Sequence, residues 1–242
     1  MEDGIAPLSV GWVARLSGHD FDCKYWEESL RPPFDPWCER LSQDGRLVLR
    51  SRSFDDLQSA DAVRKRAIPL IQRLNGAHGV AVGAEPLTFD GVGHIDDQGQ
   101  VQLHIFAELN ERLHGFMVTA TAEVRDSEGN LIPPSPSQPS NAQRWIEAAE
   151  KNDQIADMLI FAGRTDNWFD IYKAVELAEK IAGGQHKLRQ LLGASAREYE
   201  RMRDTANCDR HARFGHPPPV LTTLAEAKPV LSHIVRTVLN IG

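Results

Sequence analysis

The segment Tyr199–His216 holds the densest group of polar and charged side chains in the sequence, and three consecutive prolines follow it. If its first part is helical, Arg203, Asn207 and His211 recur at every fourth position and share one face. That face would present a permanent cation, an amide and an imidazole that titrates near neutral pH. Residues of these types at this spacing are suited to anion binding or to acid–base chemistry.

Composition sets the broad class. The chain has 242 residues, of which 41% are hydrophobic and 25% charged, as in an ordinary globular protein. Its net charge of -7 argues against a generally basic nucleic-acid coat but leaves room for a local basic groove. No apolar run approaches a membrane span, and the N-terminus lacks the pattern of a secretory signal. Three widely spaced cysteines fit a reducing compartment, so we expect a cytoplasmic protein without a membrane partner.

Metal and cofactor sites are not indicated. No Gly-rich nucleotide signature follows a strand, so we expect no cofactor. Two groups of histidine and cysteine invite a metal interpretation, but neither has the spacing of a compact zinc site. Buried or incidental thiols are the alternative for the first group, and no geometry can be argued for the second. These groups are His19, Cys23 and Cys38, and Cys208, His211 and His216.

Residues 1–127 show the alternation of half-buried strands, which predicts the antiparallel sheet of an α+β domain. Short connections suggest a meander. The prolines between Tyr25 and Arg40 indicate a loop held by aromatic side chains. His94 and His104 lie in or beside strands and are interpreted as surface or packing residues. The predicted strands cover residues 8–16, 46–53, 80–82, 86–95, 101–108 and 116–125.

A helix over residues 57–75 is expected to cover one face of this sheet. Asp55 or Asp56 would cap its start, and Asn75-Gly76 would end it. Pro69 falls inside the pattern and should kink or divide the helix.

A Pro/Ser linker over residues 128–140 separates the two halves. Four prolines and three serines fall within Ile132–Ser140, a composition typical of a stiff, extended connector. The pattern also changes here, from alternating strands to helical periodicity.

Residues 141–242 predict an all-α four-helix bundle with short loops. The helices are expected at residues 141–163 with Ser140 as cap, at 168–182, at 196–212, and from Thr222 or Thr223 onward. A helical pair with a wide apolar face could also form a homodimer through the bundle. Four aromatic side chains of the bundle are expected in its core rather than on a surface that stacks bases: Trp145, Trp168, Phe169 and Tyr172.

The order of these helices resembles that of HEPN-type domains, found in toxins, abortive-infection proteins and antiviral RNases. That family carries an Arg-polar-x-x-x-His signature late in its third main helix. Here Asn207 and His211 match the polar residue and the histidine, whereas Ala206 stands at the arginine position. Arg203 and Arg210 are nearby cations, and neither has the family's spacing.

The resemblance covers residues 140–242 and implies two alternatives. One is a non-catalytic, dimeric binding or assembly protein linked to defence or mobile elements, which the missing arginine favours. The other is a metal-independent endoribonuclease with a site shared by two protomers. In it, His211 would be the acid or base, Arg203 or Arg210 would hold phosphate, and Asn207 would orient either.

A structural interpretation of the same residues competes with catalysis. Arg203 and Arg210 would pair with acidic neighbours on a solvated helix, and His211 would interact with the helix dipole. One histidine and an unaligned arginine leave the catalytic roles incomplete, so this interpretation is favoured. The acidic neighbours are Glu200, Asp204 and Asp209.

Overall fold

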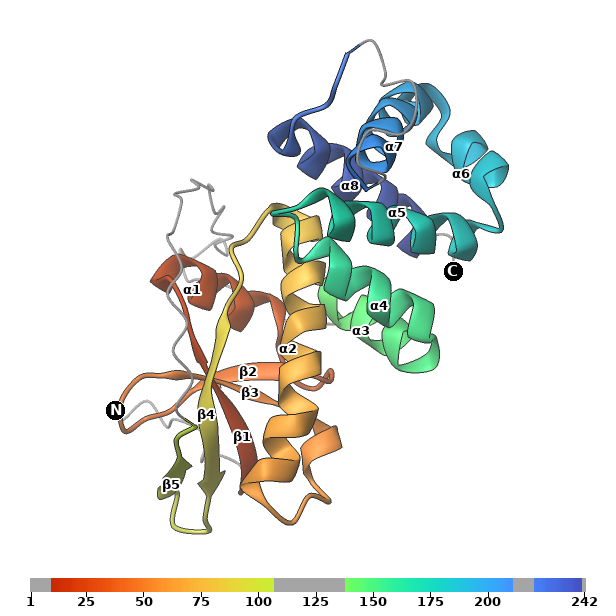
Figure 1. Cartoon of the computed structure of the whole chain (residues 1–242). Coiled ribbons are helices and arrows are strands. Elements are labelled where there is room, and N and C mark those ends of the chain that lie inside the picture. The colour runs from red at the N-terminus through yellow and green to blue at the C-terminus, as the bar shows by residue number, and fades with distance from the viewer. Residues whose placement is uncertain (1–9, 107–137, 211–219, 241–242) are drawn as a thin grey trace, which may run out of the picture.

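The computed structural model describes residues 10–106, 138–210 and 220–240. Strands and helices alternate in the first half of the chain, and the second half is helical (Figure 1). The α+β class is therefore confirmed. The first half contains β1 (Gly11–Ser17), α1 (Asp20–Ser29), β2 (Trp37–Arg40), β3 (Leu47–Arg50), the 3-10 turn η1 (Arg52–Phe54), α2 (Ala60–Val82), β4 (Thr88–Ile95) and β5 (Val101–His104). The second contains α3 (Asn141–Lys151), α4 (Asp153–Ala162), α5 (Trp168–Ala182), α6 (Gln185–Leu192), the turn η2 (Gly193–Ser195), α7 (Ala196–Arg210) and α8 (Leu224–Leu239).

The sheet is antiparallel, with strand order β2-β3-β1-β4-β5. The meander prediction is wrong, because β1 lies in the centre between β3 and β4. With α1 after β1 and α2 after β3, the first four strands have the split β-α-β (ferredoxin-like) order, and β5 extends the β4 edge. The strand expected at residues 116–125 lies outside the described residues.

Helix α2 is longer than predicted and organises the fold. Ser59, rather than an aspartate, caps its start by accepting a hydrogen bond from the Ala62 N–H, and Gly83 ends it with a positive φ of 72°. The helix is not divided at Pro69. The strand predicted over residues 80–82 is wrong, because this segment is the last turn of α2.

The segment Tyr25–Arg40, predicted as a loop, contains the end of α1 and all of β2. Its prolines begin only after α1 has ended, so they do not prevent that helix. The turn between α1 and β2 is tied to the helical half by the buried Gln143 of α3. The Gln143 Nε2 lies within hydrogen-bond distance of three backbone carbonyls of this turn, those of Arg31, Phe34 and Pro36.

The helix predicted over residues 141–163 is two helices. Ser140 caps α3, as predicted, and Gln143 completes a capping box with it. Helix α3 ends before Asn152, whose side chain caps α4 by accepting a hydrogen bond from the Gln154 N–H. The other predicted helical segments are confirmed as α5, α7 and α8, with the short α6 between α5 and α7.

One buried cluster joins the two halves of the described chain. Helix α2 packs on β1 and β4 with one side and on α3, α4 and α8 with the other (Figure 1). The contact with α4 is close at Gly76, where an added Cβ would lie 1.8 Å from the Leu159 carbonyl oxygen. The division into residues 1–127, 128–140 and 141–242 remains a prediction, since most of the linker lies outside the described residues.

Candidate functional site

Helix α7 carries Arg203, Asn207 and Arg210 of the predicted site residues. Asn207 is exposed, whereas Ala206, at the position where the family's arginine is expected, is buried with 1% of its surface accessible. An arginine side chain at this position would have to bury its charge in the helical core, which is costly without a partner. Position 206 therefore contributes to packing in this chain. The side chain of Arg210 and all of His211 lie outside the described residues.

Arg203 is bound to another helix. Its Nε donates to Glu179 Oε1 of α5 at 2.8 Å, and the same oxygen accepts from the Tyr199 hydroxyl at 2.6 Å. The prediction of an acidic partner on the same helix is wrong for Arg203, because Glu179 lies 24 residues earlier. Glu200, one of the predicted partners, pairs with Arg189 instead. The network joins α5 to α7.

Electrostatics keep this network in one protonation state at neutral pH. Burial opposes the charge of Arg203, but the Glu179 carboxylate outweighs it and raises the pKa of the guanidinium. Burial, followed by the hydrogen bond to Glu179, raises the pKa of the Tyr199 hydroxyl, which therefore remains a donor. A cation held in this way acts first as a link between helices.

Helices α5, α7 and α8 pack on one another. Glu179, near the end of α5, meets Tyr199 and Arg203 in the first half of α7, and Figure 1 shows α5, α7 and α8 packed together. Thr222, just before α8, donates its backbone N–H to Thr205 near the end of α7 at 3.1 Å. The start of α8 therefore lies beside the later part of α7.

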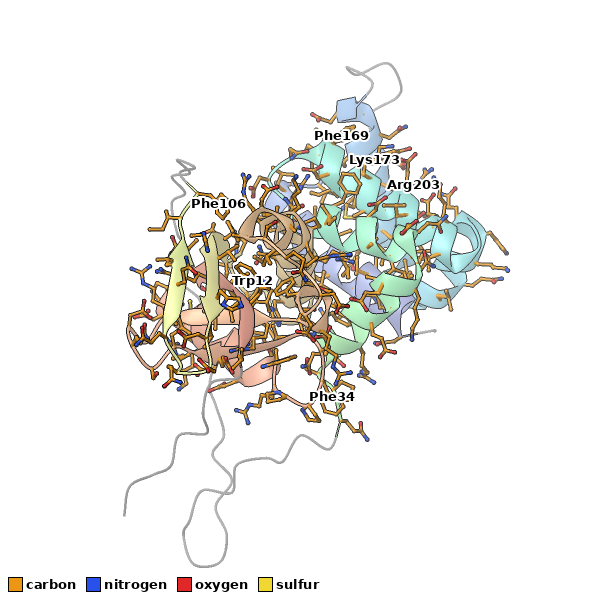
Figure 2. All side chains as sticks on the ribbon, turned by 90° about the horizontal axis from the view of Figure 1, so that it is seen from below. Trp12, Phe34, Phe106, Phe169, Lys173 and Arg203 are labelled. Atoms are coloured by element: carbon orange, nitrogen blue, oxygen red, sulfur yellow. The ribbon has the colours of Figure 1, made fainter. Side chains whose placement is uncertain are left out.

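We call the following residues near these helix ends the helix-end surface: the exposed Phe169, Asn207, Val220 and Leu221, and the partly buried Lys173, which pairs with Glu176 at 2.7 Å. Phe169 is 53% exposed, Val220 60% and Leu221 59%, and Lys173 Nζ lies 5.9 Å from the centre of the Phe169 ring. Figure 2 shows Phe169, Lys173 and Arg203 on the helical half. The surface thus combines an apolar centre with a cation and an amide.

The prediction that Phe169 is a core residue is wrong. Its neighbours Trp168, Ile171, Tyr172 and Val175 follow the helical spacing that fills the core side of α5, and Phe169 lies off that stripe. The signal was therefore present in the sequence. Trp145 and Tyr172 are buried, and Trp168 packs against the core, as predicted.

The candidate residues in the first half have structural roles. His19 caps α1 by accepting from the Phe21 N–H, and Cys23 and Cys38 are buried, which raises the pKa of both thiols. His94 packs edge-on against Trp12 with ring centres 4.6 Å apart, and His104 lies 6.0 Å from the same ring. The interpretation of both histidines as packing residues is confirmed.

Among residues 10–106, 138–210 and 220–240, no group of three or more His, Cys, Asp or Glu side chains is arranged to hold a metal ion. Within those same ranges, no helix combines the length and apolar character needed to cross a bilayer.

Comparisons with known proteins find no family model that matches this chain, and no similar curated protein or solved structure. The resemblance to HEPN-type domains therefore remains an expectation from helix order and from two motif positions.

Proposed function

We propose that this chain is a binding or assembly protein whose helix-end surface docks a second copy of the chain. The observation that carries the proposal is the exposure of Phe169 near the start of α5 and of Val220 and Leu221 just before α8. Apolar and aromatic side chains form the centre of protein interfaces, and Lys173 and Asn207 would supply the polar rim. A role in defence or in mobile elements is what the HEPN-like helix order suggests for such a dimer.

Replacing Phe169 and Leu221 together by serine is expected to weaken self-association by about tenfold or more, because both apolar anchors of the interface are lost. Sedimentation velocity over a wide range of protein concentration measures the change. Leu191→Ser is the matched control, since Leu191 is 44% exposed on α6, which is not part of the helix-end surface. A wild-type protein that stays monomeric, or a double variant that associates like wild type, would contradict the proposal.

The second candidate function is a metal-independent endoribonuclease. The exposed side chain of Asn207, one helical turn after Arg203, favours it, and Lys173 adds a cation to the same surface. His211 would act as acid or base, with Arg203 or Arg210 on the phosphate. We rank it second because Arg203 already uses its Nε on Glu179, and because the aligned position 206 holds a buried alanine.

A further inference from the structure

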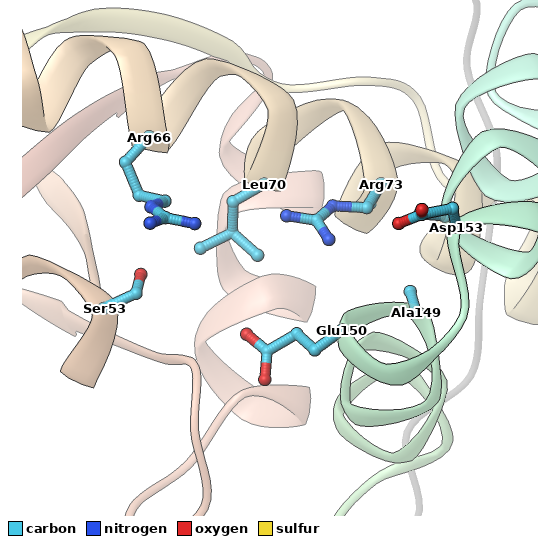
Figure 3. Close-up of a pocket in the computed structure, with 8 residues that line it drawn as sticks. Ser53, Arg66, Leu70, Arg73, Ala149, Glu150 and Asp153 are labelled. Carbon is cyan, nitrogen blue, oxygen red and sulfur yellow. The ribbon is translucent and has the colours of Figure 1, made fainter.

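A pocket of about 320 Å³ lies where the two halves of the chain meet, away from the helix-end surface. Helix α2 supplies Arg66, Leu70 and Arg73 at positions i, i+4 and i+7, which share one face. Glu150 of α3 and Asp153 of α4 line it from the helical half, and Ser53 from η1 (Figure 3). The volume is at the lower end of the range typical of small-molecule sites.

The two arginines of this pocket are available for a ligand. Figure 3 shows their side chains reaching toward each other on either side of Leu70. Among the described residues, neither guanidinium forms an ion pair, and Arg73 makes only a 3.4 Å contact from its Nε to the Pro69 carbonyl oxygen. Burial lowers the pKa of Arg73; Glu150 opposes that shift and the neighbouring charge of Arg66 adds to it.

Two carboxylates balance this charge and limit what can bind. Glu150 and Asp153 line the same pocket as Arg66 and Arg73, so the site holds two negative and two positive groups. A polyanion such as RNA would gain two arginines but meet two like charges. A small molecule that carries both signs would find a partner for each, with Leu70 and two alanines as apolar floor.

We infer that this pocket binds a small zwitterion of the α-amino acid class. The carboxylate of the ligand lies between Arg66 and Arg73, and its ammonium group donates to Glu150; Asp153 lines the pocket beyond Arg73 (Figure 3). The Ser53 hydroxyl of η1 can form a hydrogen bond with the nearer charged group of the ligand. This activity is independent of the dimer proposed above.

The test titrates the full chain with each of the common L-α-amino acids and, separately, with inorganic phosphate, by isothermal calorimetry. We expect at least one amino acid to bind, and its affinity to fall about tenfold or more in Arg73→Gln and in Glu150→Gln, since each variant removes one charged partner. Glu150→Gln should bind phosphate more tightly than wild type, because a like charge is gone. Lys65→Gln is the matched control on α2, since Lys65 is exposed and, within the described part of the chain, forms its ion pair with the exposed Asp61 on its own helix.

Three results would overturn the inference: no amino acid binds, phosphate binds wild type as tightly as the best amino acid, or Glu150→Gln leaves the amino-acid affinity unchanged. A thermal melt of each unliganded variant separates loss of the pocket from loss of the fold. If Arg73→Gln melts below the control, Glu150→Gln decides alone, because the exposed Glu150 lies outside the core.

Discussion

Replacing Gly76 by alanine is expected to lower the free energy of unfolding by about 3 kcal/mol, as overpacking does in a tight core. The new Cβ would lie 1.8 Å from the Leu159 carbonyl oxygen and 2.7 Å from the Leu159 carbonyl carbon. These are backbone atoms of α4, so no side-chain rotation relieves the clash and the two helices must separate. Urea unfolding followed by circular dichroism measures the loss.

Gly79→Ala is the matched control on the same helix. The nearest atom to a Cβ at Gly79 is the Ala84 carbonyl oxygen at 3.8 Å, an ordinary contact. Alanine is the better helix former, so this variant is expected to be as stable as wild type or more stable by up to about 1 kcal/mol. If the two variants unfold at the same urea concentration, α2 and α4 do not approach as closely as the structure has them.

Lowering the pH from 7 to 5 is expected to cost about 2 kcal/mol of stability through His78 alone. His78 is 1% exposed, and burial lowers its pKa from 6.5 to about 3. Its Nε2 lies 3.0 Å from Ser29 Oγ, and the rings of Tyr25 and Trp26 pack against it. The folded protein must therefore keep this imidazole neutral.

The direction of the effect follows from proton binding. Below pH 6.5 the unfolded chain takes up a proton at His78, whereas the folded chain does so only near pH 3, so stability is fully present above pH 6.5 and falls through that window. Urea unfolding at pH 7, 6 and 5 measures the slope, and stopping at pH 5 avoids most carboxylate titration. His78→Leu should lose this part of the slope, and the exposed His233→Gln should keep it. Equal wild-type stability at pH 7 and 5 would contradict the burial of His78.

Local signals predicted those features of the fold that depend on neighbours in sequence. The α+β division follows from the change between alternating and helical periodicity. Ser140 caps α3 as predicted, and Gly183 ends α5 with a positive φ. In each of these cases the partner atoms lie within a few residues, so the sequence is enough.

Long-range contacts account for the errors. The pair Asn75-Gly76 has the composition of a helix stop, but both residues serve distant partners inside α2. The Asn75 side chain forms two hydrogen bonds with the backbone of Leu87, each 2.8 Å long. Gly76 lacks a side chain and so allows the backbone of α4 to pack closely against α2. No local pattern distinguishes these roles from a C-terminal cap.

The candidate site shows the same limit. The spacing of Arg203 and Asn207 places them on one helix face, but the partner of Arg203 is Glu179 on α5, which only the packing of α5 on α7 brings near. The pocket at Arg66 and Arg73 was also missed, because its carboxylates come from helices in the other half of the chain. The i, i+7 spacing of those arginines was visible, although spacing alone does not reveal the opposite wall.

The central claim is that the helix-end surface binds a second copy of the chain and does not cleave RNA. The most direct test incubates a mixed RNA pool with wild type and with His211→Ala, in the presence of EDTA. The claim predicts that neither protein cleaves the pool and that both show the same oligomeric state. Cleavage by wild type that is lost in His211→Ala, with fold and oligomeric state unchanged, would contradict it and establish the endoribonuclease instead.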